Sequence, residues 1–164
     1  MNDLKQLREM FRPLPGNHYM LVCTGVDEVA FLFQDMMREV GGKLNIVLYT
    51  QDETDDASKL QDASVERVTD LSKLFRAMPR DHDTVLFKDV FSVHKDQKAM
   101  LRLAYLTLAN TANIMIMEKK GSMDVSIVKE MLDEHEFRAP NDIDIVEGYD
   151  LVSAKKMHMW GNGL

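Results

Sequence analysis

The stretch DTVLFKDVFSVHKDQKAMLRLAYLTLANTANIMIMEK, residues 83–119, decides the fold class of this chain. It begins with an apolar segment that ends in Lys88 and Asp89, continues as an amphipathic helix, and finishes with a second apolar segment at 113–117. Two apolar strands joined by a crossing helix are typical of a βαβ unit, whose strands are parallel. Because ligands bind at the carboxyl ends of parallel strands, we expect a functional site near Lys88 and Asp89.

The rest of the chain shows the same alternation of strand and helix patterns. Short apolar runs predict further strands at 18–24, 44–49 and 64–68. Apolar residues at three- and four-residue intervals predict helices at 2–11, 26–40 and 70–78, and after a cap at Ser122 or Asp124. This alternation indicates a mostly parallel sheet with helices on both faces.

The end of the chain has a different pattern. Residues 141–157, NDIDIVEGYDLVSAKKM, alternate between polar and apolar on both sides of Glu147-Gly148. Alternation around a short glycine-containing turn predicts a hairpin of two antiparallel strands. We therefore expect an α/β fold whose parallel strands are followed by an antiparallel pair.

Composition and charge limit the function classes. The chain has 164 residues, 45% of them hydrophobic and 29% charged, which suits one domain, 1–164, with its own core. The formal net charge of −7 disfavours nucleic acid as a partner. A single cysteine, Cys23, excludes an internal disulfide, and no apolar stretch approaches the roughly 20 residues that span a bilayer. We expect a cytoplasmic protein without a membrane partner.

The order of these elements resembles that of class I S-adenosylmethionine-dependent methyltransferases. The resemblance rests on the segment 83–121 and on the closing FRAPNDIDIVEGYDLVSAKKM, and it extends over roughly 18–157. It implies a Rossmann-like three-layer sandwich with a C-terminal antiparallel hairpin. An N-terminal helix at 1–15 would precede this core, and a tail at 158–164 would follow it.

The loop after the first strand departs from the family's pattern, which is an acidic residue followed by alternate glycines. Here the sequence reads MLVCTGVDEVAF, so Cys23 stands at the acidic position and Gly25 matches the first glycine. Asp27 and Val29 occupy the later glycine positions, where their side chains are expected to narrow the loop.

The resemblance assigns further cofactor contacts to the loops that follow the strands. Thr24, Gly25 and Asp27 would lie against the methionine part of the cofactor, and Thr50 or Asp52 against its ribose. Asp70 would approach the adenine. Lys88, at the end of the fourth strand, would contact the methyl donor.

Two residues are candidate general bases at the substrate side. Asp89 ends the fourth strand, and His94 follows in the turn SVHKD. A strand-end ion pair competes as an interpretation of Asp89, and a solvated turn residue as one of His94. Glu118 is interpreted as a solvated loop residue, and Cys23 as a small buried hydrophobe.

No metal site is predicted. The five histidines show none of the close spacings of zinc ligands. The acidic run at 52–56 lacks the glycine and the terminal glutamate of a calcium loop, so it is interpreted as a solvated loop.

Three functions remain open. The first is a methyltransferase acting on a small molecule with S-adenosylmethionine as its methyl donor. The second is a non-catalytic protein of the same fold that has lost the cofactor site and binds a partner. The third, a nucleotide- or sugar-phosphate-binding protein, is disfavoured by Asp27 and Glu28, which would repel an anion. The tail Met157-His158-Met159-Trp160 is the one hint of a homodimer.

Overall fold

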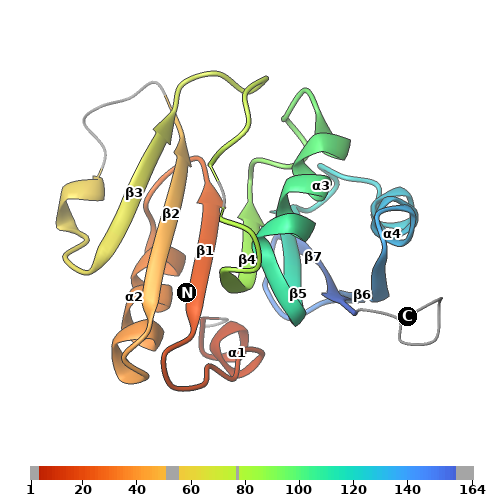
Figure 1. Cartoon of the computed structure of the whole chain (residues 1–164). Helices are drawn as coiled ribbons and strands as arrows, with labels where there is room; N and C mark the ends of the chain where they lie inside the picture. The colour runs from red at the N-terminus through yellow and green to blue at the C-terminus, as the bar shows by residue number, and fades with distance from the viewer. Residues whose placement is uncertain (1–3, 51–55, 77, 158–164) are drawn as a thin grey trace.

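The computed structural model describes residues 4–50, 56–76 and 78–157 of the chain. These residues form a seven-stranded sheet in the order β3-β2-β1-β4-β5-β7-β6, with helices on both faces (Figure 1). The strands are β1 (His18–Cys23), β2 (Lys43–Tyr49), β3 (Ala63–Val68), β4 (His82–Lys88), β5 (Leu108–Lys119), β6 (Phe137–Ile143) and β7 (Tyr149–Lys156).

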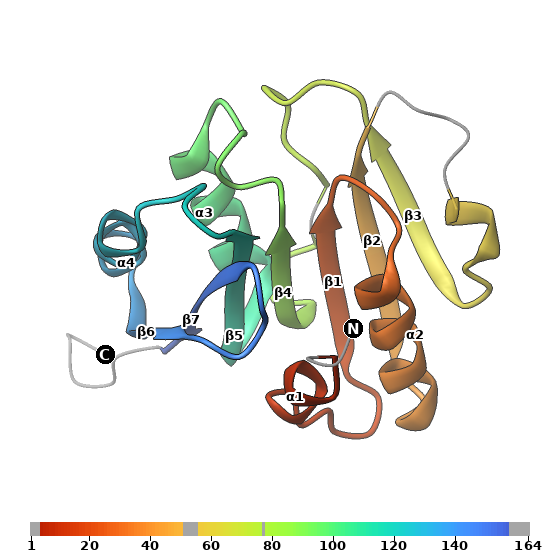
Figure 2. The same ribbon diagram turned by 180° about the vertical axis from the view of Figure 1, so that it is seen from behind.

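The helices cover the two faces separately. They are α1 (Leu4–Glu9), α2 (Glu28–Glu39), α3 (Gln97–Thr107) and α4 (Val125–Glu134), with the short 3-10 turn η1 (Asp56–Lys59) before β3. Seen from behind, α1 and α2 lie over β1 and β2, whereas α3 lies on the opposite face (Figure 2). The alternation of strand side chains produces both cores. Leu21 packs with α2, and its neighbours Met20 and Val22 pack on the α3 side.

The predicted sheet is confirmed in its pairing. β1 pairs in parallel with both β2 and β4, and β4 pairs in parallel with β5. β7 pairs antiparallel with β5, and β6 pairs antiparallel with β7, so the last two strands form the antiparallel pair that the hairpin pattern predicts. Gly148, with φ +81°, lies in the turn between them. No helix among the described residues is long and apolar enough to cross a membrane.

Aspartates begin the three longer helices. Asp27, Asp96 and Asp124 are the N-caps of α2, α3 and α4, and each side chain accepts a hydrogen bond from a first-turn backbone N–H. Such caps satisfy donors that have no partner within the helix. Of the two caps proposed for the last helix, the structure shows Asp124.

The helix predicted at 70–78 is absent from the described part of that segment. Residues 69–76 and 78–81 form turns and irregular backbone between β3 and β4. Tertiary contacts hold this path instead of a helix, because Phe75 is buried in the core and the ring of His94 binds the carbonyl of Lys73. Helical spacing alone is a weak signal against such contacts.

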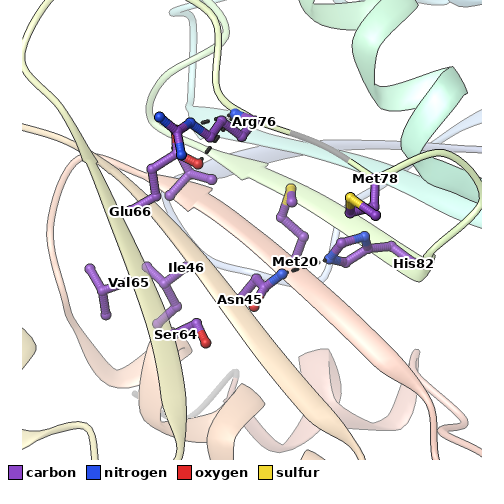
Figure 3. A pocket seen from close by; sticks show the side chains of 10 residues that line it. Met20, Asn45, Ile46, Ser64, Val65, Glu66, Arg76, Met78 and His82 are labelled. Atoms are coloured by element: carbon purple, nitrogen blue, oxygen red, sulfur yellow. Dashed lines mark hydrogen bonds between the residues drawn. The ribbon is translucent and has the colours of Figure 1, made fainter.

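A pocket of about 330 Å³ lies between this irregular segment and the sheet (Figure 3). Met20, Asn45 and Glu66 contribute from β1, β2 and β3, and Arg76 and Met78 come from the segment itself. A carboxylate oxygen of Glu66 accepts a hydrogen bond from the backbone N–H of Arg76 at 3.2 Å, which joins the segment to β3. The pocket therefore occupies a part of the sheet face that the predicted helix would have covered.

The two glycines between α2 and β2 test how closely this turn packs against the loop before β1. A Cβ on Gly42 would lie 2.2 Å from the carbonyl oxygen of Asn17, whereas Gly41 has open space but a φ of +61°. We expect Gly42→Ala to lower the free energy of unfolding by about 2 kcal/mol through overpacking. Gly41→Ala should lower it by about 1 kcal/mol through backbone strain. Urea unfolding of both variants measures this, and equal losses would show that the Asn17 loop moves aside.

Candidate functional site

The candidate site lies where β1 and β4 end. Cys23 and Lys88, the last residues of these neighbouring parallel strands, are paired in the sheet. The loop 24–27 leaves β1, and Asp89 leaves β4, at the same edge. Because β1 and β4 are parallel neighbours, Asp27 lies beside Lys88 and Asp89 although about sixty residues separate them in the sequence. This is the edge where ligands of parallel sheets bind.

The ammonium of Lys88 is the centre of this site. Its Nζ lies 2.8 Å from Oδ2 of Asp27 and 2.8 Å from Oδ2 of Asp89. It also lies 3.3 Å from the hydroxyl of Tyr149 and 5.0 Å from the centre of that ring. Only 5% of the residue is exposed, so these groups replace water around a buried charge.

Charge pairing determines the protonation of Lys88. Burial alone lowers the pKa of a lysine, because it disfavours the charged form. Here the hydrogen bonds and charges of Asp27 and Asp89 outweigh burial, so the pKa of Lys88 lies above its ordinary value. The lysine is a permanent cation at neutral pH, which makes it a binding group for an anion and excludes it as a base.

Asp89 holds an uncommon backbone conformation. Its φ is +60°, in the left-handed region that aspartate tolerates better than most residues. Its backbone N–H donates to the carbonyl of Met117 at 3.0 Å, and its Oδ2 also accepts from the hydroxyl of Tyr149 at 3.3 Å. The turn at Asp89 thus directs its carboxylate back over the end of its own strand.

Asp27 has two structural roles at once. Its Oδ1 accepts from the backbone N–H of Val29 at 2.9 Å and caps α2, while its Oδ2 holds Lys88. Its side chain is 42% exposed, so one side of the carboxylate remains open to a ligand. Val29 itself is buried in the core beside α2. The expectation that Val29 narrows the loop is therefore wrong, because its side chain points away from it.

Two further residues complete this edge and were missed or misinterpreted in the sequence. Tyr149 begins β7, and no local motif links it to Lys88. Glu118, at the end of β5, is 1% exposed and not the solvated residue that its neighbours Lys119 and Lys120 suggested. Burial raises its pKa above the ordinary value, although its Oε1 accepts from the backbone N–H of Ser92 at 2.8 Å. Glu118 orders the loop after β4.

His94 is buried and not a solvated turn residue. Its Nδ1 accepts from the backbone N–H of Asp96 at 2.9 Å, so Nε2 carries the proton and donates to the carbonyl of Lys73 at 2.9 Å. Its ring also packs edge-on against Tyr49. Both ring nitrogens are thus hydrogen-bonded to backbone atoms. A role for His94 as a base stays a prediction.

The other predicted cofactor residues lie along the same edge of the sheet. Thr24 is exposed, and a Cβ on Gly25 would meet no atom within 4 Å, so the loop after β1 has open space beside it. The backbone N–H of Thr50 donates to the carbonyl of Val68 at 3.1 Å, just after β2. Asp70 is half-buried and accepts from the N–H of Ser72 at 2.8 Å, which lowers its pKa. Asp52 lies outside the described residues.

Cys23 behaves as a buried hydrophobe. It is almost fully buried in the core beside α2, and burial raises the pKa of its thiol to about 12. A protonated thiol is a poor nucleophile. Cys23 also cannot offer the carboxylate that the family carries at this position, and Asp27 is the acidic group nearest to it along the loop.

No protein-family model matches the sequence, and no curated protein matches it. Several solved structures are similar to this one. An S-adenosylmethionine-dependent methyltransferase from Aquifex aeolicus superimposes with a TM-score of 0.74 at 14% identity, over 94% of this chain and 90% of that one. The YcgJ protein of Bacillus subtilis gives 0.74 at 10% identity, over 96% and 99%.

A third similar structure contains the methyl donor. It is phosphoethanolamine N-methyltransferase 2 of Haemonchus contortus in complex with S-adenosyl-L-methionine, with a TM-score of 0.74 at 11% identity. The match covers 96% of this chain but 52% of that chain. The chain has the class I methyltransferase fold. At these identities the likeness confirms the predicted fold class and does not by itself establish an activity.

The Lys88 cluster makes a prediction about stability. Lys88→Met leaves Asp27 and Asp89 facing each other without a counterion, so we expect the free energy of unfolding to fall by about 2 kcal/mol. This is less than for a fully buried pair, because Asp27 is partly exposed. Lys120→Met is the matched control. It removes a surface pair with Asp144 and should change stability by less than about 0.5 kcal/mol. Equal effects in urea unfolding at pH 7 would contradict the central role of Lys88.

Cys23 gives a second, simpler test. We expect a thiol-specific reagent at pH 8 to leave the folded protein unmodified and to label one thiol per chain after denaturation, since Cys23 is the one cysteine of the sequence. The physical reason is the combination of burial and a pKa of about 12. Rapid labelling of the native protein, followed by absorbance, would show instead that the end of β1 opens.

Proposed function

We propose that this chain binds S-adenosylmethionine at the carboxyl ends of β1 and β4 and transfers its methyl group to a small molecule. One observation carries the proposal. A buried, permanently charged Lys88 lies between two carboxylates at the strand ends, beside the open loop at Gly25. The methyltransferase fold supports the same position, because ligands of parallel sheets bind at this edge.

The charges at the site fit this cofactor. The amino-acid end of S-adenosylmethionine carries an ammonium and a carboxylate, and its sulfonium makes the molecule a net monocation. Asp27, Lys88 and Asp89 together carry a net charge of −1, so their field attracts such a ligand. Asp27 is the partly exposed member that accepts from the ammonium, and Lys88 faces the carboxylate. Asp27 thus takes over the acidic role that Cys23 does not provide.

The remaining proposed cofactor contacts lie in the loops that follow β1, β2 and β3. Thr24 and Gly25 border the amino-acid end of the cofactor. Thr50, or Asp52 outside the described residues, would hold the ribose hydroxyls, and Asp70 the adenine. Each of these residues follows the carboxyl end of a strand, so the three loops meet at one edge.

The bound cofactor supplies a methyl group activated by the positive sulfur. The protein's main contribution is to position the acceptor in line with that bond. We assign the proton of the acceptor to Asp89, whose Oδ2 is held by Lys88 and Tyr149. Asp89 is preferred to His94 because the nitrogens of His94 are both hydrogen-bonded to backbone.

The net charge of the chain bears on the class of methyl acceptor. A net charge of −7 favours a small molecule over nucleic acid as the methyl acceptor. We also infer a cytoplasmic protein and a homodimer formed through the end of the chain. Met157, the last described residue, is 41% exposed, and an apolar side chain there suits a subunit contact.

Calorimetric titration with S-adenosylmethionine and S-adenosylhomocysteine tests the proposal. We expect micromolar binding to the wild type. Asp27→Asn keeps the helix cap but removes the charge, so it should weaken binding by about tenfold. Asp35→Asn, on the surface of α2 with an ion pair to Arg38, should leave the affinity unchanged.

Asp27→Gly separates this function from its alternative. If the wild type binds neither ligand and Asp27→Gly gains binding, the site is closed by Asp27 and the proposal is wrong. That result would identify the non-catalytic protein of the same fold. Loss of binding in Asp27→Gly would support the role of the carboxylate as a cofactor contact.

A further inference from the structure

A second cluster of polar side chains lies at the opposite, amino-terminal edge of the same two strands. His18 begins β1, and His82 begins β4, immediately after Asp81. One nitrogen from each ring and one carboxylate oxygen of Asp81 lie within 4.8 Å of one another. Among the described residues this is the group of histidine, cysteine and carboxylate side chains that has the spacing of a metal site.

Two ring nitrogens in this cluster have no partner. Nε2 of His18 and Nδ1 of His82 are buried, and neither forms a hydrogen bond. His82 is 1% exposed, and buried polar atoms are nearly always hydrogen-bonded in native proteins. Two buried ring nitrogens without partners therefore cost free energy of folding. A metal ion that binds a nitrogen of each ring would remove this cost.

The other nitrogen of each ring has a neighbour. Nδ1 of His18 lies 3.2 Å from Oδ2 of Asp81, and Nε2 of His82 lies 3.2 Å from Nδ2 of Asn45. The amide N–H of Asn45 donates to Nε2 of His82, so a neutral ring carries its proton on Nδ1. Metal binding through Nδ1 therefore requires that this proton move to Nε2 and that the amide of Asn45 turn its oxygen to accept it.

We propose that His18, Asp81 and His82 bind a divalent transition-metal ion, for which Zn²⁺ is the natural probe. Imidazole nitrogens suit Zn²⁺, Cu²⁺ and Ni²⁺ better than Ca²⁺ or Mg²⁺, which take oxygen ligands. Two histidines and one carboxylate are a three-ligand set that leaves a position for water. The half-exposed carboxylate of Asp81 gives the ion its entry from solvent.

Binding also requires a change in ring orientation. The two rings are stacked, with their centres 3.9 Å apart and their planes 32° from parallel. The lone pairs of a ring lie in its plane, so stacked rings do not point at one ion. His18 has the more exposed ring of the pair. A turn of this ring gives up its present contact with Asp81, so that a lone pair of His18 and the released carboxylate can both face the ion. His82, fixed by Asn45, stays in place.

The position gives the ion a role apart from methyl transfer. It would join the first residues of β1 and β4 and would lie beside the pocket of Figure 3, where His82 and Met78 are neighbours. The cofactor site occupies the other end of these strands. The metal proposal is therefore independent of the proposed function, and its readouts do not involve the adenosyl ligands.

Metal titration of the untagged protein, first stripped with a chelator, tests this inference. We expect one Zn²⁺ per chain at micromolar affinity or tighter. We expect Asp81→Asn and His18→Gln each to weaken binding by at least about tenfold, which is the loss seen even for outer partners of a metal. Co²⁺ should produce visible absorption bands in the wild type, and Asp81→Asn should shift them because a carboxylate ligand is lost, a signature that a merely structural role would not give.

Two control variants keep the test specific. Asp144→Asn removes an exposed carboxylate, and His135→Gln removes a histidine at the end of α4. Neither should change the affinity for Zn²⁺. The proposal is overturned if the wild type shows no one-to-one binding below millimolar Zn²⁺. It is equally overturned if Asp81→Asn and His18→Gln bind as tightly as the two controls.

Discussion

The ammonium of Lys88 is a buried charge, and the carboxyl edge of the sheet is arranged around it. A lysine in this position is tolerated only when hydrogen-bonded anions replace its water. This requirement accounts for an aspartate at position 27, where the sequence pattern of class I methyltransferases has a glycine, and for the left-handed turn at Asp89. It also explains why Tyr149 of β7 reaches back across the sheet. Removing the charge would leave Asp27, Asp89 and Tyr149 without their common partner.

The ion pair of Asp27 and Lys88 also limits which charged groups a ligand can present here. Asp27 and Lys88 already satisfy each other, so a ligand with one charge would break their pair and bury the group left behind. A zwitterion can exchange partners, because its ammonium replaces Lys88 at Asp27 while its carboxylate takes the freed ammonium. No charge is then left unpaired, which is the usual penalty for disturbing a buried ion pair. The pair therefore favours an amino-acid group over a simple anion.

Much of this architecture could be read from the sequence, because it depends on local patterns. The apolar runs of β1, β2 and β4 and the alternation around Gly148 have few other interpretations. The failure at 70–78 has a physical cause. Its helical spacing was overridden when Phe75 entered the core and His94 bound the carbonyl of Lys73. The site was predictable only by its edge, since Tyr149 meets Lys88 through the fold and through no spacing in the chain.

The two polar clusters at opposite ends of β1 and β4 follow from one property of parallel sheets. Parallel neighbours begin at one edge and end at the other, so two strands alone bring four segment ends into two groups. Between those groups β1 and β4 carry buried apolar side chains on both faces of the sheet, such as Val22 and Phe87 on one face and Leu21 and Leu86 on the other. Such a close-packed core fixes the distance between the two groups and the register of the strands. Histidines 64 positions apart can thus meet at one edge, while Asp27 meets Lys88 at the other.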